Sequence, residues 1–234
     1  DGWGFTSDAV TCIDYAAAHG ARIINASWGG GGYSQALVDA INAAGEKNVL
    51  FVAAAGNSGL NLQSEVGERF PAYPAGYNLE SIVAVAAIDR RGELAGFSNF
   101  GALSVDLGAP GVQIFSAAGG IPKQRYDTFS GTSMATPHVA GVAALALAVH
   151  PDLKVVELKS LLQASATPTT SLQGKTISGG RANAYSAVSA AADQNLELAL
   201  SLPTGRTLFP EREFAVVAHD TDLYARPGPT ETGT

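Results

Sequence analysis

The chain has 234 residues, of which 46% are hydrophobic and 15% charged, a balance typical of a globular rather than a disordered protein. Its formal net charge of -7, without any basic run, argues against a nucleic-acid-binding surface, which needs clustered Lys and Arg. Because Cys12 is the only cysteine, neither an internal disulfide nor a cysteine-based metal site can form.

Helical and extended patterns alternate through most of the chain, which predicts an α/β domain with a largely parallel sheet. The first helix is expected to begin among residues 6–8 and to end at Gly20, and a second helix is expected over residues 34–44. Residues 23–26, apart from Asn25, and residues 49–53 form short apolar runs. Such runs are typical of parallel strands that are buried on both faces.

In the middle of the chain the pattern changes to short strands, expected over residues 82–85 and 112–115 and separated by turns that contain Gly and Pro. Helices return after this region. They are expected over residues 132–150, 154–164 and 182–192.

The segment over residues 132–150 is apolar almost all round, which places it in the middle of the domain. Its longest apolar run, residues 139–149, is shorter than the about 20 residues that a membrane-spanning helix needs. We therefore expect a buried helix and no membrane span.

The composition changes again near Asp193. Residues 196–200 and 214–218 have strand-like patterns, with prolines and glycine between them. We place a domain boundary here, with residues 1–193 as the main domain and 194–234 as the start of a β-rich module that is too short to complete a β-sandwich. The tail resembles the start of the bacterial immunoglobulin-like modules that follow secreted hydrolases.

The most informative string is Gly-Thr-Ser-Met-Ala-Thr-Pro-His-Val-Ala-Gly over residues 131–141, which places Ser133 at the mouth of the buried helix. Backbone N–H groups in the first turn of a helix have no internal partners and lie at the positive end of its dipole, which favours negative charge beside Ser133. The alternative is an ordinary N-cap serine.

The whole string resembles the nucleophile motif of the subtilisin-like serine protease family, and the resemblance extends over residues 1–192. It implies a three-layer α/β fold in which Ser133 attacks a peptide carbonyl and forms an acyl-enzyme. Asn57 ends a second similar string, Ala-Ala-Ala-Gly-Asn over residues 53–57. It would complete the oxyanion hole together with the backbone N–H of Ser133. The alternative for Asn57 is a turn-forming residue before Ser58 and Gly59.

The resemblance also implies a substrate-binding groove. One wall of the specificity pocket would be formed by Ser27, Trp28 and Gly29, and the facing wall by Ala54, Ala55 and Gly56. A second edge, Gly2, Trp3 and Gly4, would hold the extended peptide by strand addition. Glycines that simply end strands are the alternative for each segment. The similar segments 73–77, 97–101 and 107–111 are expected to form turns and to carry no chemistry.

The Asp and His of the family's catalytic triad lie upstream of the residues in this chain. The four histidines, at positions 19, 138, 150 and 219, lack the glycine-rich flanks of the family's base, and Asp8 and Asp14 are expected to be solvated on the first helix. We therefore expect a fragment of a longer secreted serine endopeptidase that is inactive alone. The rival hypothesis is a non-catalytic peptide-binding or adhesive protein derived from a protease.

No cofactor is firmly implied, although a structural calcium ion in the full-length protein is compatible with the resemblance. Asp106 falls roughly where some relatives bind a cation, but we expect it to be a solvated surface residue and assign no metal site. The expected partners are protein or peptide substrates.

Overall fold

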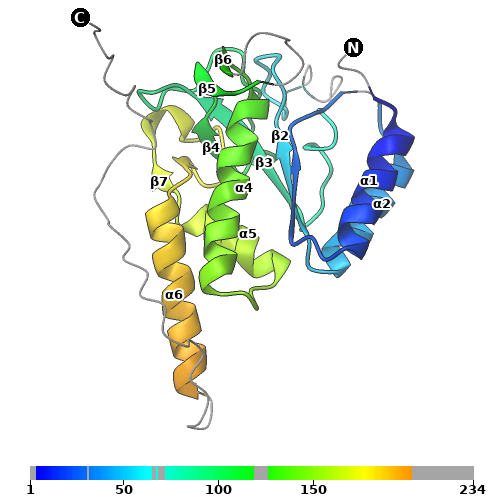
Figure 1. Ribbon diagram of the computed structural model, residues 1–234. Helices are drawn as coiled ribbons and strands as arrows, with labels where there is room; N and C mark the ends of the chain where they lie inside the picture. The colour runs from blue at the N-terminus through cyan, green and yellow to red at the C-terminus, as the bar shows by residue number, and fades with distance from the viewer. Residues whose placement is uncertain (1–3, 31, 65–66, 68–71, 119–125, 202–234) are drawn as a thin grey trace, which may run out of the picture.

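The core of the protein is a mostly parallel sheet between two layers of helices (Figure 1). The computed structural model describes residues 4–30, 32–64, 67, 72–118 and 126–201, and side chains as far as residue 193. The strand order is β1-β2-β3-β4-β8-β7, in which the first five strands are parallel and β7 is antiparallel to β8. These strands are β1 Ile23–Ala26, β2 Leu50–Ala54, β3 Ile82–Ile88, β4 Leu107–Pro110, β7 Thr167–Pro168 and β8 Gly180–Arg181. The expected three-layer α/β arrangement is confirmed.

Helices cover both faces of this sheet. On one face lie α1 (Thr6–Ala18) and α2 (Gln35–Glu46), and on the other lie α4 (Thr132–Val149), α5 (Val155–Ala164) and α6 (Ala184–Ser201) (Figure 1). A short 3₁₀ helix η1 (Thr170–Leu172) precedes β8, and a separate antiparallel ribbon pairs β5 (Ile114–Ala117) with β6 (Tyr126–Phe129). The helices predicted from apolar periodicity are present, and Ser34 caps α2 by accepting from Leu37 N.

The alternation of side chains along β2 divides the interior into two cores. Leu50 and Val52 point to the face that packs against α4, α5 and α6, whereas Phe51 and Ala53 point to the face that packs against α1 and α2. All residues of β2 and β3 are buried, as expected for central parallel strands covered on both faces. Burial of this apolar surface is the main stabilising contribution to the sheet.

Helix α4 occupies the centre of one helical layer. It contacts strands β1 to β4 and packs against α5 and α6. Among the described residues it is long and apolar enough to cross a membrane by length and composition, which the shorter run of residues 139–149 did not suggest. Its packing between the sheet and α6 is nevertheless that of the core helix predicted from its apolar composition.

Two strand predictions need correction. Strand β1 is not fully buried, because it lies at the edge of the sheet and only Ala26 reaches complete burial. Residues 107–111 do not merely form a turn, since Leu107–Pro110 is the buried strand β4 between β3 and β8. Gly108 and Pro110 conceal this strand in the sequence. Proline has no N–H to donate to the sheet, and Pro110 stands at the last position of the strand.

The prediction of a strand over residues 196–200 is wrong, because α6 continues through them to Ser201. Leu, Glu and Ala are good helix formers, and the first residue that breaks a helix is Pro203, beyond that point. The second predicted strand, residues 214–218, lies outside the described residues, as does most of the module proposed for residues 194–234.

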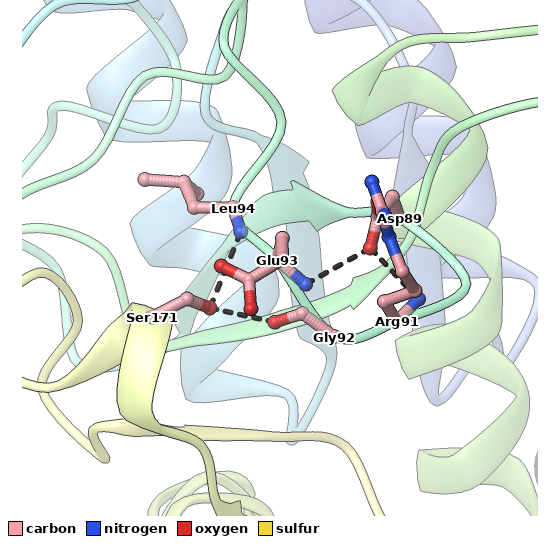
Figure 2. A network of polar contacts seen from close by, with 6 residues as sticks. All are labelled: Asp89, Arg91, Gly92, Glu93, Leu94 and Ser171. Atoms are coloured by element: carbon pink, nitrogen blue, oxygen red, sulfur yellow. Dashed lines mark hydrogen bonds and ion pairs between the residues drawn. The ribbon is translucent and has the colours of Figure 1, made fainter.

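The turn after β3 is fixed by two polar side chains, which Figure 2 shows. Asp89 Oδ1 accepts from the backbone N–H groups of Arg91 at 2.8 Å and Glu93 at 2.9 Å. The hydrogen bond from Glu93 is the main reason that the pKa of Asp89 lies below its usual value.

Ser171 holds the other side of the same turn. Its Oγ donates to Gly92 O at 2.6 Å and accepts from Leu94 N. These two hydrogen bonds attach η1 to the turn.

Candidate active site

Two loops and one helix meet at the carboxyl edge of the sheet. Because Ala26 lies beside Ala53 in the parallel pair β1 and β2, the chain leaves both strands side by side and in the same direction. The beginning of α4 reaches the same place, since Ser27 Oγ donates to Ser133 O at 2.8 Å. Ligands of open α/β sheets commonly bind at such an edge.

Ser133 is the second residue of α4, as predicted. The helix is preceded by Gly131, whose N–H donates to Gly111 O at 2.8 Å and whose carbonyl accepts from Met134 N at 3.0 Å. The N–H of Ser133 donates to no residue within the described part of the chain, as is usual in the first turn of a helix. A free donor beside the Ser133 hydroxyl is therefore present in this geometry.

Asn57 is tied directly to the start of α4. Its Oδ1 accepts from Thr132 N at 2.9 Å and from Thr132 Oγ1 at 3.0 Å, and the Thr132 hydroxyl in turn accepts from Gly56 N at 3.2 Å. These contacts fix the amide plane of Asn57. Its Nδ2 group donates to no other described residue. A Cβ added to Gly131 would lie 3.5 Å from Asn57 Nδ2 and 3.7 Å from Ser133 N. Both donors therefore border the same small space.

Thr132 was not among the predicted site residues, although it lies next to the predicted nucleophile. The residue is completely buried, and its hydroxyl both accepts and donates, which links the loop after β2 to the helix. The burial of its hydroxyl becomes visible only in the fold, and the sequence marks Thr132 only by its place beside Ser133.

The segments predicted as pocket walls lie where the two strands end. Trp28 is 42% exposed and packs edge-on against the buried Phe51 ring, with a centroid distance of 6.3 Å. Gly29 approaches Tyr73 so closely that a Cβ would lie 3.0 Å from Tyr73 O, and Gly30 N donates to that same oxygen at 2.9 Å. This contact explains the absence of a side chain at position 29.

The facing segment is more deeply buried. Ala54 and Ala55 are buried at the end of β2, and Gly56 follows with a φ of +100°, a conformation that side chains disfavour. No described contact connects the second predicted edge to the site. Gly4 makes no hydrogen bond to another described residue, and Gly2 and Trp3 lie outside the described residues.

The histidines within the described residues have other surroundings. His19 is exposed and stacks on Tyr15, and His138 Nδ1 pairs with Met134 O at 2.9 Å within α4. His150 is buried at the end of α4. His219 lies outside the described residues. None of the three described histidines hydrogen-bonds Ser133.

Asp106 is not the solvated residue that we expected. It is 2% exposed, and its carboxylate accepts from Ala84 N and Gln163 Nε2, both at 2.6 Å, and lies 3.3 Å from Lys159 Nζ. Burial raises the pKa of Asp106 even though the Lys159 charge opposes the shift. Asp8 and Asp14, by contrast, are exposed on α1 as expected. The described part of the chain has no group of three or more His, Cys, Asp and Glu residues that could hold a metal ion.

Comparison with known proteins decides the family. The sequence model of the subtilase family matches residues 2–195. The chain belongs to the subtilase family. Subtilisin DY from Bacillus licheniformis is 40% identical to it over 167 residues, which cover 71% of this chain and 57% of that protein. The thermophilic serine proteinase of Bacillus sp. (strain AK1) is 40% identical over 188 residues, which cover 80% and 43%.

Solved structures agree with this assignment of the subtilase chain. The prenylagaramide maturation protease PagA superimposes with a TM-score of 0.65 at 33% identity, over 78% of this chain and 66% of that one. A protease from Pseudoalteromonas arctica PAMC 21717 superimposes with a TM-score of 0.68 at 30% identity, over 80% and 59%. The subtilase chain spans 43% to 60% of the length of the first curated relatives that it matches.

Proposed function

We propose that this subtilase chain carries the nucleophile and the oxyanion hole of a serine endopeptidase. The observation that carries the proposal is the junction of Asn57 with Thr132, which leaves Asn57 Nδ2 and the N–H of Ser133 beside one space. Two converging donors next to a serine hydroxyl suit the oxygen that becomes negative when a carbonyl is attacked.

In the proposed reaction, Ser133 Oγ bonds to the carbonyl carbon of the scissile peptide and gives its proton to a histidine base. The carbonyl electron pair moves to the oxygen, which Asn57 Nδ2 and Ser133 N stabilise. When the tetrahedral intermediate collapses, the C–N bond breaks and the histidine protonates the leaving amine. Water then hydrolyses the acyl-enzyme by the same steps and releases the acid product.

The base and the aspartate that orients it are proposed to lie upstream of residue 1 in the full-length protein. Two observations support this. None of the three described histidines hydrogen-bonds Ser133, and the His138 ring pairs instead with Met134 O. Strand β1 also has an open edge, with Ile24 partly exposed and Asn25 exposed, where further strands of the same sheet could pair.

Protein or peptide substrates are proposed to bind as an extended segment beside Ser27, Trp28 and Gly29 on one side and Ala54, Ala55 and Gly56 on the other. The backbone of Gly29 makes no hydrogen bond to another described residue, which suits main-chain pairing with a peptide. An extracellular location is proposed as well, on the strength of the resemblance to secreted proteases.

Labelling with a fluorophosphonate probe tests the proposal. The full-length protein should react with the probe at Ser133 and should cleave peptides, whereas the Ser133→Ala variant should do neither. Peptide binding without hydrolysis or labelling would favour the rival hypothesis of a non-catalytic peptide-binding protein. Equal labelling of both proteins would place the nucleophile elsewhere.

A further inference from the structure

Asn99 is a buried polar residue that the proposed chemistry leaves without a role. It lies in the turn that leads from β3 towards β4, and it is 3% exposed. All three hydrogen bonds of its side-chain amide go to the backbone of the loop that carries Asn57. A buried amide is costly unless it is hydrogen-bonded, so Asn99 depends on this one loop for all of its side-chain partners.

The amide of Asn99 holds this loop on both sides of Asn57. Its Nδ2 donates to Ala55 O at 2.9 Å, before the loop turns. Its Oδ1 accepts from Ser58 N at 3.1 Å and from Leu60 N at 3.0 Å, after the turn. One planar side chain therefore fixes the distance between the two arms of the loop.

The fit between Asn99 and the residue before Asn57 is equally close. The N–H of Asn99 donates to Gly56 O at 2.9 Å, and a Cβ on Gly56 would lie 2.5 Å from Asn99 Nδ2. Because Gly56 has a φ of +100°, the position requires glycine for its conformation and for its space. The backbone that precedes Asn57 therefore packs closely against the Asn99 amide.

We propose that Asn99 is a positioning residue for the oxyanion hole: it sets the backbone of Asn57, while Thr132 sets the Asn57 side chain. The inference rests on the proposed function. Stabilisation of an oxyanion depends on donors that are already placed before the reaction, and a displacement of about 1 Å can lower the rate by about 100-fold. Asn99 also holds Ala55 and Gly56 in one wall of the proposed substrate groove, whereas the other wall makes no hydrogen bond to it. Asn99 should therefore affect kcat more strongly than KM.

A double-mutant cycle in the full-length protein tests this role. We expect Asn99→Ala to lower kcat by about 10- to 100-fold, with a smaller change in KM. In an Asn57→Ala background, where the donor is already missing, the same substitution should lower kcat by less than about twofold further. A merely structural residue would cause the same loss in both backgrounds.

A second variant covers the case in which Asn99→Ala does not fold. Asn99→Asp keeps an acceptor for Ser58 N and Leu60 N but replaces the donor to Ala55 O with an oxygen. We expect it to lose kcat as well, with the same dependence on Asn57.

Ser98→Ala is the matched control. Ser98 is also buried, but its hydroxyl accepts from Ala87 N at 2.9 Å and donates to Asn99 O at 3.0 Å, and it makes no hydrogen bond to the described residues of the Asn57 loop. It should lower Tm while kcat stays within about twofold of the parent. Three results would overturn the inference: an unchanged kcat in the Asn99 variants, a change in KM alone, or an equal loss of kcat in both backgrounds. Absence of Ser133 labelling in the parent protein would instead refute the proposed function.

Discussion

Thr132 joins the candidate nucleophile to the candidate oxyanion donor through a single hydroxyl. In Thr132→Val the side-chain shape is kept, but Asn57 Oδ1 loses one of its two donors and Gly56 N loses its acceptor. We expect kcat to fall by about 10-fold, equivalent to about 1.4 kcal/mol, because the Asn57 amide is less firmly oriented. Peptide hydrolysis under steady-state conditions measures this loss. Thr132→Ser retains the hydroxyl and should keep most of the activity; a Thr132→Val enzyme with full kcat would exclude the orienting role.

At the same scale, the sequence indicated Ser133 and Asn57 because each lies in a local string of distinctive residues. It did not indicate Thr132 or Asn99. The side chains of these two residues act through partners that lie 76 and 44 positions away along the chain, Gly56 for Thr132 and Ala55 for Asn99. Such partners are invisible to any reading of neighbouring residues, because only the fold brings them together.

At the scale of elements, Asp106 connects the sheet to α5. Its carboxylate binds Ala84 N of β3 and Gln163 of α5, and it pairs with Lys159, whose Nζ also donates to Ile82 O. Because burial raises the pKa of Asp106 in the folded protein, its contribution to stability is complete below the unfolded value of 3.8. That contribution is lost as the pH rises through the folded pKa.

Asp106→Asn removes this titration while it keeps an acceptor for Ala84 N. We compare the free energy of unfolding of the parent with that of the variant. The parent's value minus the variant's value should decrease as the pH rises from 3.8 through the folded pKa. Urea denaturation of both proteins across this pH range measures the difference. A difference that grows with pH would mean that the Lys159 charge outweighs burial and that the pKa is lowered.

Elements were predictable where their side chains repeat. The apolar face of α2 and the mostly apolar composition of α4 each identify a helix without reference to the fold. Strand β4 could not be recognised, because Gly108 is required by packing rather than by strand propensity: a Cβ there would lie 2.6 Å from Leu172 Cδ1. The edge position of β1 likewise depends on which strands pair, and an apolar run alone does not specify that.

For the whole molecule, the open edge of β1 and the surroundings of the histidines lead to one prediction about activity. The chain of 234 residues produced alone should label with a fluorophosphonate far more slowly than the full-length protein, because the proposed base lies upstream and no described histidine hydrogen-bonds Ser133. Loss of triad members in a subtilisin leaves only about 10³- to 10⁴-fold acceleration over water, so the expected deficit is several orders of magnitude.

The comparison needs a folded chain, which circular dichroism of the α/β domain can verify before the labelling rate is measured. Labelling at the rate of the full-length protein would show that a base lies within the chain. His138, which is one and a half helical turns from Ser133 on α4, would then be the first residue to substitute. Slow labelling that is restored only when the upstream residues are present would instead assign the base to them, since Ser133 and Asn57 are common to both proteins.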